Sequence, residues 1–293
     1  MVPVSLRILT QALRDGGTVV LSGAGLSTES GIPDYRGPSG RARAARPMTY
    51  QAFTGSERAR QRYWARSHLG WRHMTGATPN AGHRAVAEFQ RRGLVTAIIT
   101  QNVDGLHQAA GRSLRGTAAA VTELHGSLHR VVCLSCWQRT SRHELDERLR
   151  AANPDWEFTR GVILPAGHED GPAEPAVNPD GDVALEETAG FTIVDCLACG
   201  GVLKPDVVFF GENVPRARVE ACYAQVRAAS SLVVLGSSLT VMSGLRYVRH
   251  AASLGLPVVI VNQGETRGDD LATARLDAPL GQTLTALLAE LVS

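Results

Sequence analysis

The fold is decided by the stretch Gly23-Ala24-Gly25-Leu26-Ser27-Thr28-Glu29-Ser30-Gly31-Ile32-Pro33-Asp34-Tyr35-Arg36-Gly37, which directly follows the apolar run Thr18-Val19-Val20-Leu21. The apolar run predicts a buried strand. Closely spaced glycines after a strand let backbone N–H groups approach a phosphate, as they do where parallel α/β folds bind nucleotides. A long run of small and polar residues, glycines and a proline at this place therefore indicates a binding loop.

The rest of the chain continues the α/β pattern. Apolar periodicity predicts further strands at residues 94–99, 231–235 and 256–261, and helices at residues 4–15, 80–92 and 280–292. Each strand ends in a polar or glycine-rich loop. In an open parallel sheet such loops share one edge, where ligands bind. The sequence therefore predicts an α/β fold with a Rossmann-like parallel sheet.

The residue composition and hydrophobic pattern of the sequence change after His125. Residues 130–200 hold two Cys-x-x-Cys pairs and a stretch rich in Pro, Gly and Asp at 165–182, which predicts an inserted module with a long loop. We therefore expect a Rossmann-like domain from residues 1–129 and 201–293, and a small zinc-binding module at 130–200. Aromatic and polar residues predict a helical excursion of the first domain at about 38–78, covering the loop.

Composition excludes several classes of protein. The chain has 293 residues, is 44% hydrophobic and carries a net charge of +2. This charge is too small to argue for a specific nucleic-acid partner. The sequence has no apolar run of about 18 residues and no signal-peptide pattern, so we expect a cytoplasmic protein without a membrane partner. Its basic residues are 29 arginines and one lysine, Lys204. We attribute this excess of arginine over lysine mainly to codon bias.

Four of the five cysteines form two knuckles, Cys133-x-x-Cys136 and Cys196-x-x-Cys199. Each knuckle can present two sulfurs to one tetrahedral Zn²⁺. A site closed by four cysteines has no open position, so the zinc would be structural. The alternative is a set of four buried thiols without metal.

Polar residues follow the strand at 94–99 as Gln101-Asn102-Val103-Asp104. Such residues can form plain turns, or they can line a site at the sheet edge. His125 lies between the sheet and the inserted module, where an imidazole can accept a proton. His107 and His129 compete for that role. The glycine loop departs from the standard dinucleotide fingerprint, so an NAD-dependent hydride-transfer enzyme is a rival hypothesis.

Taken together, these motifs resemble the sirtuin family of NAD-dependent protein deacylases. The resemblance covers nearly the whole chain. Its motifs are residues 23–36, 100–107, 124–126, both cysteine pairs, 204–212, 236–239 and 261–262. Residues 28–30 and 61–66 most resemble the class II branch, and the composition suggests a bacterial member.

The resemblance implies a site at the strand ends. His125 and Asn102 would be catalytic, with His125 as general base on the ribose hydroxyls. Acyl-lysine proteins would enter between the two domains. Their backbone would pair with Val208, Phe209, Gly211 and Glu212 by strand addition. The implied NAD contacts are Gly23, Ala24, Ser27, Ile32, Pro33, Asp34, Tyr35, Arg36, Gln101, Asn102, Val103, Asp104, His125, Gly236, Ser237, Ser238, Asn262, Gln263, Gly264 and Leu280.

The implied reaction consumes NAD and yields nicotinamide, O-acyl-ADP-ribose and free lysine. The alternative is protein mono-ADP-ribosylation at the same site. Tyr63 and Arg66 have the spacing of the pair by which class III sirtuins recognise acidic acyl groups, and a guanidinium with a phenol suits a carboxylate. Otherwise both residues pack or pair on a helix.

Overall fold

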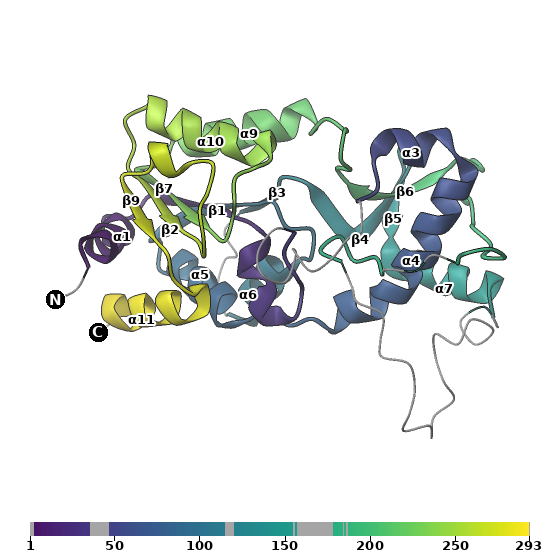
Figure 1. Ribbon diagram of the computed structural model, residues 1–293, viewed down its shortest axis with the longest axis horizontal. Coiled ribbons are helices and arrows are strands. Elements are labelled where there is room, and N and C mark those ends of the chain that lie inside the picture. The colour runs from purple at the N-terminus through teal and green to yellow at the C-terminus, as the bar shows by residue number, and fades with distance from the viewer. Residues whose placement is uncertain are drawn as a thin grey trace, which may run out of the picture. The chain divides into compact units, whose positions relative to one another are not determined.

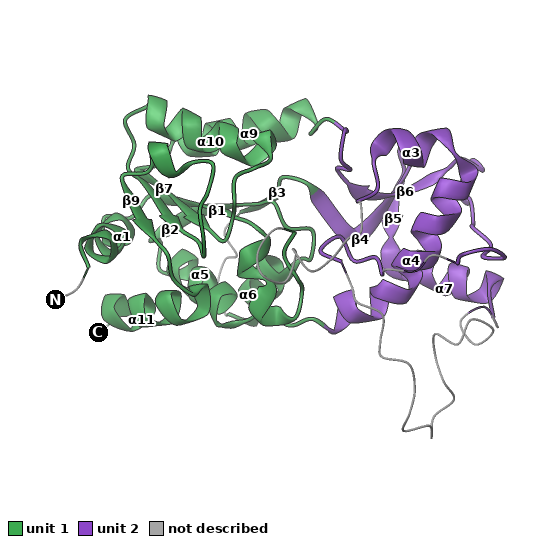
Figure 2. Ribbon diagram, in the orientation of Figure 1, with its two compact units in different colours: residues 1–43, 77–125, 213–293 green, residues 44–76, 126–212 purple. Residues whose placement is uncertain are grey.

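The computed structural model describes residues 3–35, 47–114, 120–154, 156, 178–183, 185 and 187–292. The chain divides into two compact units (Figure 2). The first comprises residues 1–43, 77–125 and 213–293, and the second comprises residues 44–76 and 126–212. The expected helical excursion thus clusters with the cysteine-containing unit and not with the parallel sheet. The second unit also extends beyond the expected limits of 130 and 200.

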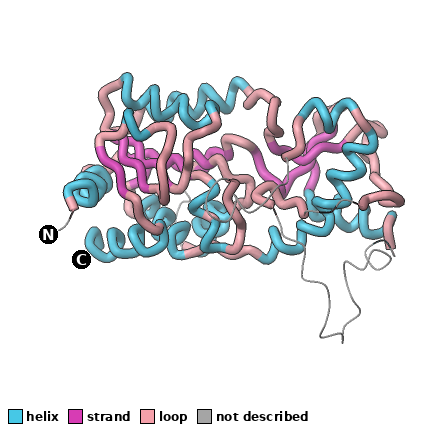
Figure 3. The backbone as a smooth tube through the Cα atoms, viewed as in Figure 1, coloured by secondary structure: helices cyan, strands magenta, loops and turns pink. Residues whose placement is uncertain are grey.

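The first unit is built on a parallel sheet, as predicted (Figures 1 and 3). Its described strands are β1 (Thr18–Ser22), β2 (Val95–Thr100), β3 (Val121–Glu123), β7 (Ser231–Leu235), β8 (Val258–Val261) and β9 (Ala274–Leu276). They lie in the order β3-β2-β1-β7-β8-β9. This is the doubly wound arrangement, and its strand order reverses between β1 and β7.

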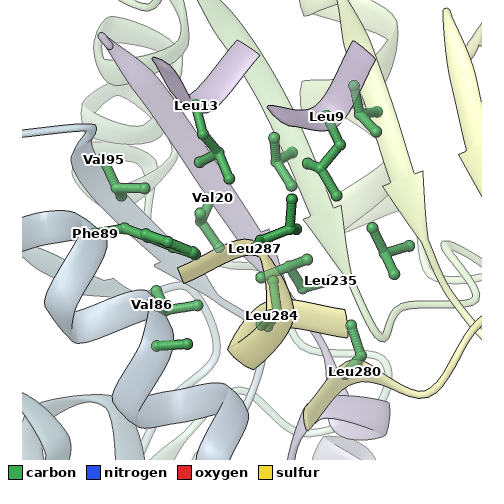
Figure 4. Close-up of a cluster of buried hydrophobic side chains, with 14 of the residues drawn as sticks. Leu9, Leu13, Val20, Val86, Phe89, Val95, Leu235, Leu280, Leu284 and Leu287 are labelled. Atoms are coloured by element: carbon green, nitrogen blue, oxygen red, sulfur yellow. The ribbon is translucent and has the colours of Figure 1, made fainter. Parts of the chain in front are cut away.

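Helices cover both faces of this sheet, which is why its strands are apolar on both sides. One face carries α1 (Val4–Arg14), α5 (Ala81–Arg91) and α11 (Leu280–Val292), and the other carries α9 (Arg216–Arg227) and α10 (Met242–Ser253). Val20 of β1 belongs to the first core, with Phe89 and Leu284 (Figure 4), whereas Val19 and Leu21 belong to the second. Each such side chain stabilises the fold by about 1.5–3 kcal/mol.

The start of α5 connects the core to the glycine loop. The Asn80 carboxamide oxygen accepts a hydrogen bond from the His83 backbone N–H at 3.1 Å, which satisfies a free donor of the first helical turn. The Asn80 amide group also donates to the Leu26 carbonyl at 2.7 Å. Helix α6 (Leu106–Ser113) follows β2 and packs on α5. These contacts hold the loop against the helical layer.

The second unit contains an antiparallel sheet in the order β5-β4-β6. Its elements are α3 (Tyr50–Gly55), α4 (Glu57–Gly76), β4 (Gly126–Cys133), β5 (Arg139–Ser141), α7 (Arg142–Ala152) and β6 (Leu203–Val207). The Trp64 indole donates to the Leu203 carbonyl at 3.2 Å. Arg142 is 1% exposed, and its guanidinium lies 5.4 and 4.8 Å from the ring centroids of Trp64 and Trp71. These contacts explain why α4 clusters with this unit.

No helix in the described ranges is both long and apolar enough to cross a membrane.

Two buried histidines of the first unit make its stability depend on pH. The rings of His83 and His107 lie 5.1 Å apart between centroids. Burial lowers the pKa of His83 to about 2, with His107 adding to the effect, and burial lowers the pKa of His107 to about 4. Both pKa values lie below the unfolded value of about 6.5, so the unfolded chain takes up protons that the folded chain refuses.

We expect the free energy of unfolding to be fully retained above about pH 6.5 and to fall as the pH drops toward the folded pKa values, by about 1.4 kcal/mol per pH unit for each histidine. Urea titrations followed by circular dichroism at several pH values measure this slope. His107→Gln should make the slope shallower. Equal slopes for wild type and variant would contradict the assignment.

Candidate functional site

The glycine loops that follow β1 and β7 meet at the ends of these two neighbouring strands. The Gly25 N–H donates to the Gly236 carbonyl at 2.9 Å. A Cβ at Gly23 would lie 2.7 Å from the Ser237 Cβ, and one at Gly236 would lie 2.5 Å from the Leu26 nitrogen. Gly236 also has a φ of 63°. These glycines are therefore required for the two loops to approach each other, in addition to the tight backbone geometry and the ligand approach that the sequence indicates.

The first loop continues in two 3₁₀ turns, Ala24–Leu26 and Thr28–Ser30. The Glu29 carboxylate accepts a hydrogen bond from the Gly281 N–H at 3.0 Å, in the first turn of α11, where a negative charge is favourable. Ile32 is buried at 3% exposure and Tyr35 is 36% exposed. Arg36, predicted to be part of the same loop, lies outside the described residues.

Three polar side chains join this loop to the end of β2. The Asn102 amide donates to the Gly23 carbonyl and to Ser27 Oγ, both at 3.0 Å. Ser27 Oγ donates to Asp104 Oδ2 at 2.7 Å, and Asp104 Oδ1 accepts from the Leu106 N–H at 2.9 Å. The structure thus brings together Ser27, Asn102 and Asp104 at the end of β2.

His125 lies at the same edge of the sheet, directly after β3. Its Nδ1 is 3.0 Å from the Gln101 carbonyl oxygen, which can only accept, so Nδ1 carries the proton. Nε2 is then an acceptor, and Ser243 Oγ donates to it at 2.7 Å. The pKa of His125 is lowered to about 4, mainly by burial. The hydrogen bond to the Gln101 carbonyl raises this pKa, and the positive charge of Arg218 lowers it. The imidazole is therefore neutral at pH 7.

The two competing histidines make different contacts. His107 Nε2 is 2.9 Å from Ser22 Oγ, at the end of β1, and His107 is buried at 3% exposure. His129 belongs to the second unit and packs on Trp71.

Ser243 was missed by the sequence interpretation. It lies in the first turn of α10, the helix that follows the β7 loop. The signal that could have found it is its position, because the helix after a strand-end loop starts at the ligand-binding edge.

The remaining strand-end residues extend the site along β7 and β8. The Gln101 amide donates to Ser237 Oγ at 2.8 Å. The Asn262 amide donates to the Gln263 and Gly264 carbonyls, both at 3.0 Å, and Leu280 is 6% exposed. Amide, hydroxyl and glycine-loop groups thus line a continuous edge of the sheet, which fits an extended ligand such as a dinucleotide.

The four knuckle cysteines form a cluster that could hold a metal. Their sulfurs all lie within 4.8 Å of one another. The Cys133–Cys199 and Cys136–Cys196 sulfur pairs are 3.5 and 3.8 Å apart. The edge of a ZnS₄ tetrahedron with Zn–S bonds of about 2.3 Å is about 3.8 Å. The donor set and its dimensions therefore fit Zn²⁺ in a closed, structural site.

The segment expected to bind substrate follows β6. Phe209 is 6% exposed, and its ring lies 5.3 Å from that of Phe53 and 5.2 Å from that of Tyr63. Val208 is partly exposed and Gly211 is exposed. The Glu212 carboxylate is held within the segment, since Oε2 accepts from the Phe209 N–H at 2.9 Å.

Tyr63 and Arg66 lie one turn apart on α4. Tyr63 is 1% exposed within the aromatic cluster. The Arg66 guanidinium donates to the Val183 carbonyl at 2.6 Å and pairs with Asp182 at 3.0 Å. This arrangement supports the alternative that the two residues pack and pair within the unit.

We expect purified protein to carry one zinc ion per chain, measured by plasma mass spectrometry. Cys136→Ser removes one thiolate ligand, so zinc content and the thermal midpoint of the protein should both fall. Cys222→Ser is the matched control, because Cys222 is buried in the other unit, and it should keep the zinc. Fresh wild-type protein without zinc would refute the metal centre.

Comparisons with known proteins agree with this geometry. A model of the Sir2 family matches residues 23–243. An NAD-dependent protein deacetylase 1 of Streptomyces coelicolor is 58% identical over 95% of this chain and 87% of its own length. Its namesake in Mycobacterium avium is 50% identical over 93% and 90%. A solved structure of Sir2 with a p53 peptide and NAD⁺ has a TM-score of 0.73 and 28% identity, covering 97% of this chain and 98% of its own. The chain therefore belongs to the Sir2 family.

Proposed function

We propose that this chain is an NAD-dependent protein-lysine deacetylase that releases nicotinamide, O-acetyl-ADP-ribose and free lysine. The observation that carries the proposal is the neutral His125 imidazole, whose Nδ1–H bonds the carbonyl of Gln101, the residue before Asn102, and whose Nε2 is the acceptor. The names of the relatives support the same activity. They favour it over mono-ADP-ribosylation, since both carry deacetylase names.

In this proposal the residues at the strand ends, from the glycine loop to Asn262, would hold NAD. When bound, it supplies nicotinamide as the leaving group and the ribose as the acyl acceptor. Asn102 and Asp104 would hold the nicotinamide end, together with Ile32 and the loop residues up to Tyr35. His125 Nε2 would accept a proton from a ribose hydroxyl, and general-base catalysis of this kind contributes about 10²–10⁴-fold to the rate.

The Nδ1–H bond from His125 to the Gln101 carbonyl supports this role, because it fixes both the ring orientation and the tautomer. The Ser243 hydroxyl occupies the position in front of Nε2, where a substrate hydroxyl would bind. We propose that Ser243 gives up this bond when the ribose binds.

We propose that the enzyme removes acetyl groups in preference to acidic acyl groups. The charge of Arg66 is already matched by Asp182. Asp180 lies beside that carboxylate, and burial together with Asp182 raises the pKa of Asp180 to about 7. A bound acyl carboxylate would have to displace or lie beside these groups, which is unfavourable.

The partners we propose are acetyl-lysine proteins in the cytoplasm, without a specific nucleic acid. A cytoplasmic setting keeps the four ligating cysteines reduced. The class II assignment stays a prediction from residues 28–30 and 61–66.

His125→Ala should lower the turnover of an acetyl-lysine peptide by about 10²–10⁴, because it removes the base, while NAD still binds. Mass spectrometry of the peptide, with nicotinamide release, measures turnover, and calorimetry measures NAD binding. Ser243→Ala serves as the companion variant and should retain most of the activity. Wild-type turnover in His125→Ala would remove this residue from the mechanism, and NADH formation by the wild type would point to hydride transfer.

A panel of acetyl, lipoyl, succinyl and glutaryl peptides tests the acyl preference. We expect acetyl turnover to exceed glutaryl and succinyl turnover. Arg66→Ala should destabilise the protein by about 3 kcal/mol, since it removes the cation that pairs with the buried Asp182 carboxylate, and should leave the acyl preference unchanged. Efficient glutaryl turnover that is lost in Arg66→Ala would overturn this view.

A further inference from the structure

The single lysine of the chain lies in an enclosed position in the second unit. The Lys204 side chain is 3% exposed. Its ammonium donates to the backbone carbonyls of Pro205, at 3.2 Å, and Val207. It also pairs with the Glu212 carboxylate at 3.0 Å. Three oxygens therefore surround a group that has three N–H donors.

The face of an aromatic ring completes the enclosure. Lys204 Nζ lies 4.7 Å from the centroid of the Phe209 ring. An ammonium over a ring face is attracted by the negative face of the π-system, and the attraction is strongest where water is excluded. Phe209 is itself fixed by Phe53 and Tyr63. The charge is thus held between the strand end and the aromatic cluster.

The presence of a lysine at position 204 is unusual for a chain with this composition. The chain has 30 basic residues, and every one except Lys204 is arginine. A compact ammonium can point its donors at three separate oxygens, whereas a guanidinium is a larger planar fork suited to bidentate partners. The geometry around Nζ therefore explains why a chain so biased toward arginine has a lysine at this position.

The Val207 carbonyl, the Phe209 ring and the Glu212 carboxylate that contact Nζ belong to one short segment. This segment, residues 207–212, starts at the end of β6 and turns back at Gly211, which has a φ of 79°. The Glu212 N–H donates to the Phe209 carbonyl at 3.0 Å, and the Glu212 carboxylate bonds both the Phe209 N–H and Lys204. Lys204 thus ties the beginning of the segment to its end.

We propose that Lys204 is a positioning residue for the acyl-peptide, which acts by holding residues 207–212 in the conformation that pairs with the peptide backbone. The proposal rests on the proposed function and deepens it. It also gives the Glu212 side chain a role different from direct substrate pairing, namely closure of the turn on Lys204. An ammonium bonded to these carbonyls and to Glu212 fixes the backbone before the peptide arrives, which lowers the ordering cost of binding.

The test compares Lys204→Arg with the wild type in steady-state kinetics. Lys204→Arg keeps the charge and loses the compact geometry. We expect KM for the acetyl-peptide to rise roughly tenfold, which corresponds to about one hydrogen bond to a charged group, with kcat and KM for NAD changed less than about twofold. Lys204→Met should raise the peptide KM further.

Glu212→Gln provides a second variant of similar volume should Lys204→Met fail to fold, and it should also raise the peptide KM. Arg139→Met is the matched control, since it removes an exposed cation that pairs with Asp206 in the same unit, and its peptide KM should not change. Zinc content and circular dichroism verify the fold. A wild-type peptide KM in folded Lys204→Arg would overturn the inference. No NAD-dependent turnover by the wild type would instead refute the proposed function.

Discussion

The close approach of two glycine loops is the constraint on which the first unit depends. The strands β1 and β7 are neighbours in the sheet, but the chain leaves them toward opposite halves of the fold. Gly23 and Gly236 have no room for a Cβ at this junction. Because the backbones pack directly, the Gly23 carbonyl is placed to accept from Asn102, and Glu29 reaches the start of α11. The polar network of the candidate site is therefore built on a contact between backbones.

Buried cations organise the second unit in a similar way. Arg142 lies against two tryptophan rings and pairs with Asp146 at 3.3 Å, whereas Lys204 lies among carbonyls and a carboxylate. Each charge has a partner and hydrogen bonds, which is the condition under which a buried charge is tolerated. The planar guanidinium of Arg142 packs against flat aromatic rings, whereas the compact ammonium of Lys204 bonds oxygens that lie in several directions.

Local patterns predicted much of this architecture because their causes are local. The β1 and β7 strands and the α11 helix appear where apolar periodicity placed them. The four-cysteine cluster followed from the knuckle spacing. The strands β3 and β9 were missed, since three residues are too few to show a period. The helix α4 was assigned to the wrong neighbours, because its aromatic residues show that it packs but not on what.

The sequence by itself determined the longer strands of the parallel sheet, the order of the polar strand ends and the metal ligands, because each of these depends on residue types at short spacing. Only the tertiary structure decided which groups face one another. It brought Ser243 to His125 Nε2 across 118 positions of the chain and paired Arg66 with Asp182. It also enclosed Lys204, the single lysine of a chain whose excess of arginine over lysine is attributed mainly to codon bias. Hydrogen bonds and ion pairs between distant segments form only when packing brings those segments together. Residue patterns within one short segment therefore do not predict them.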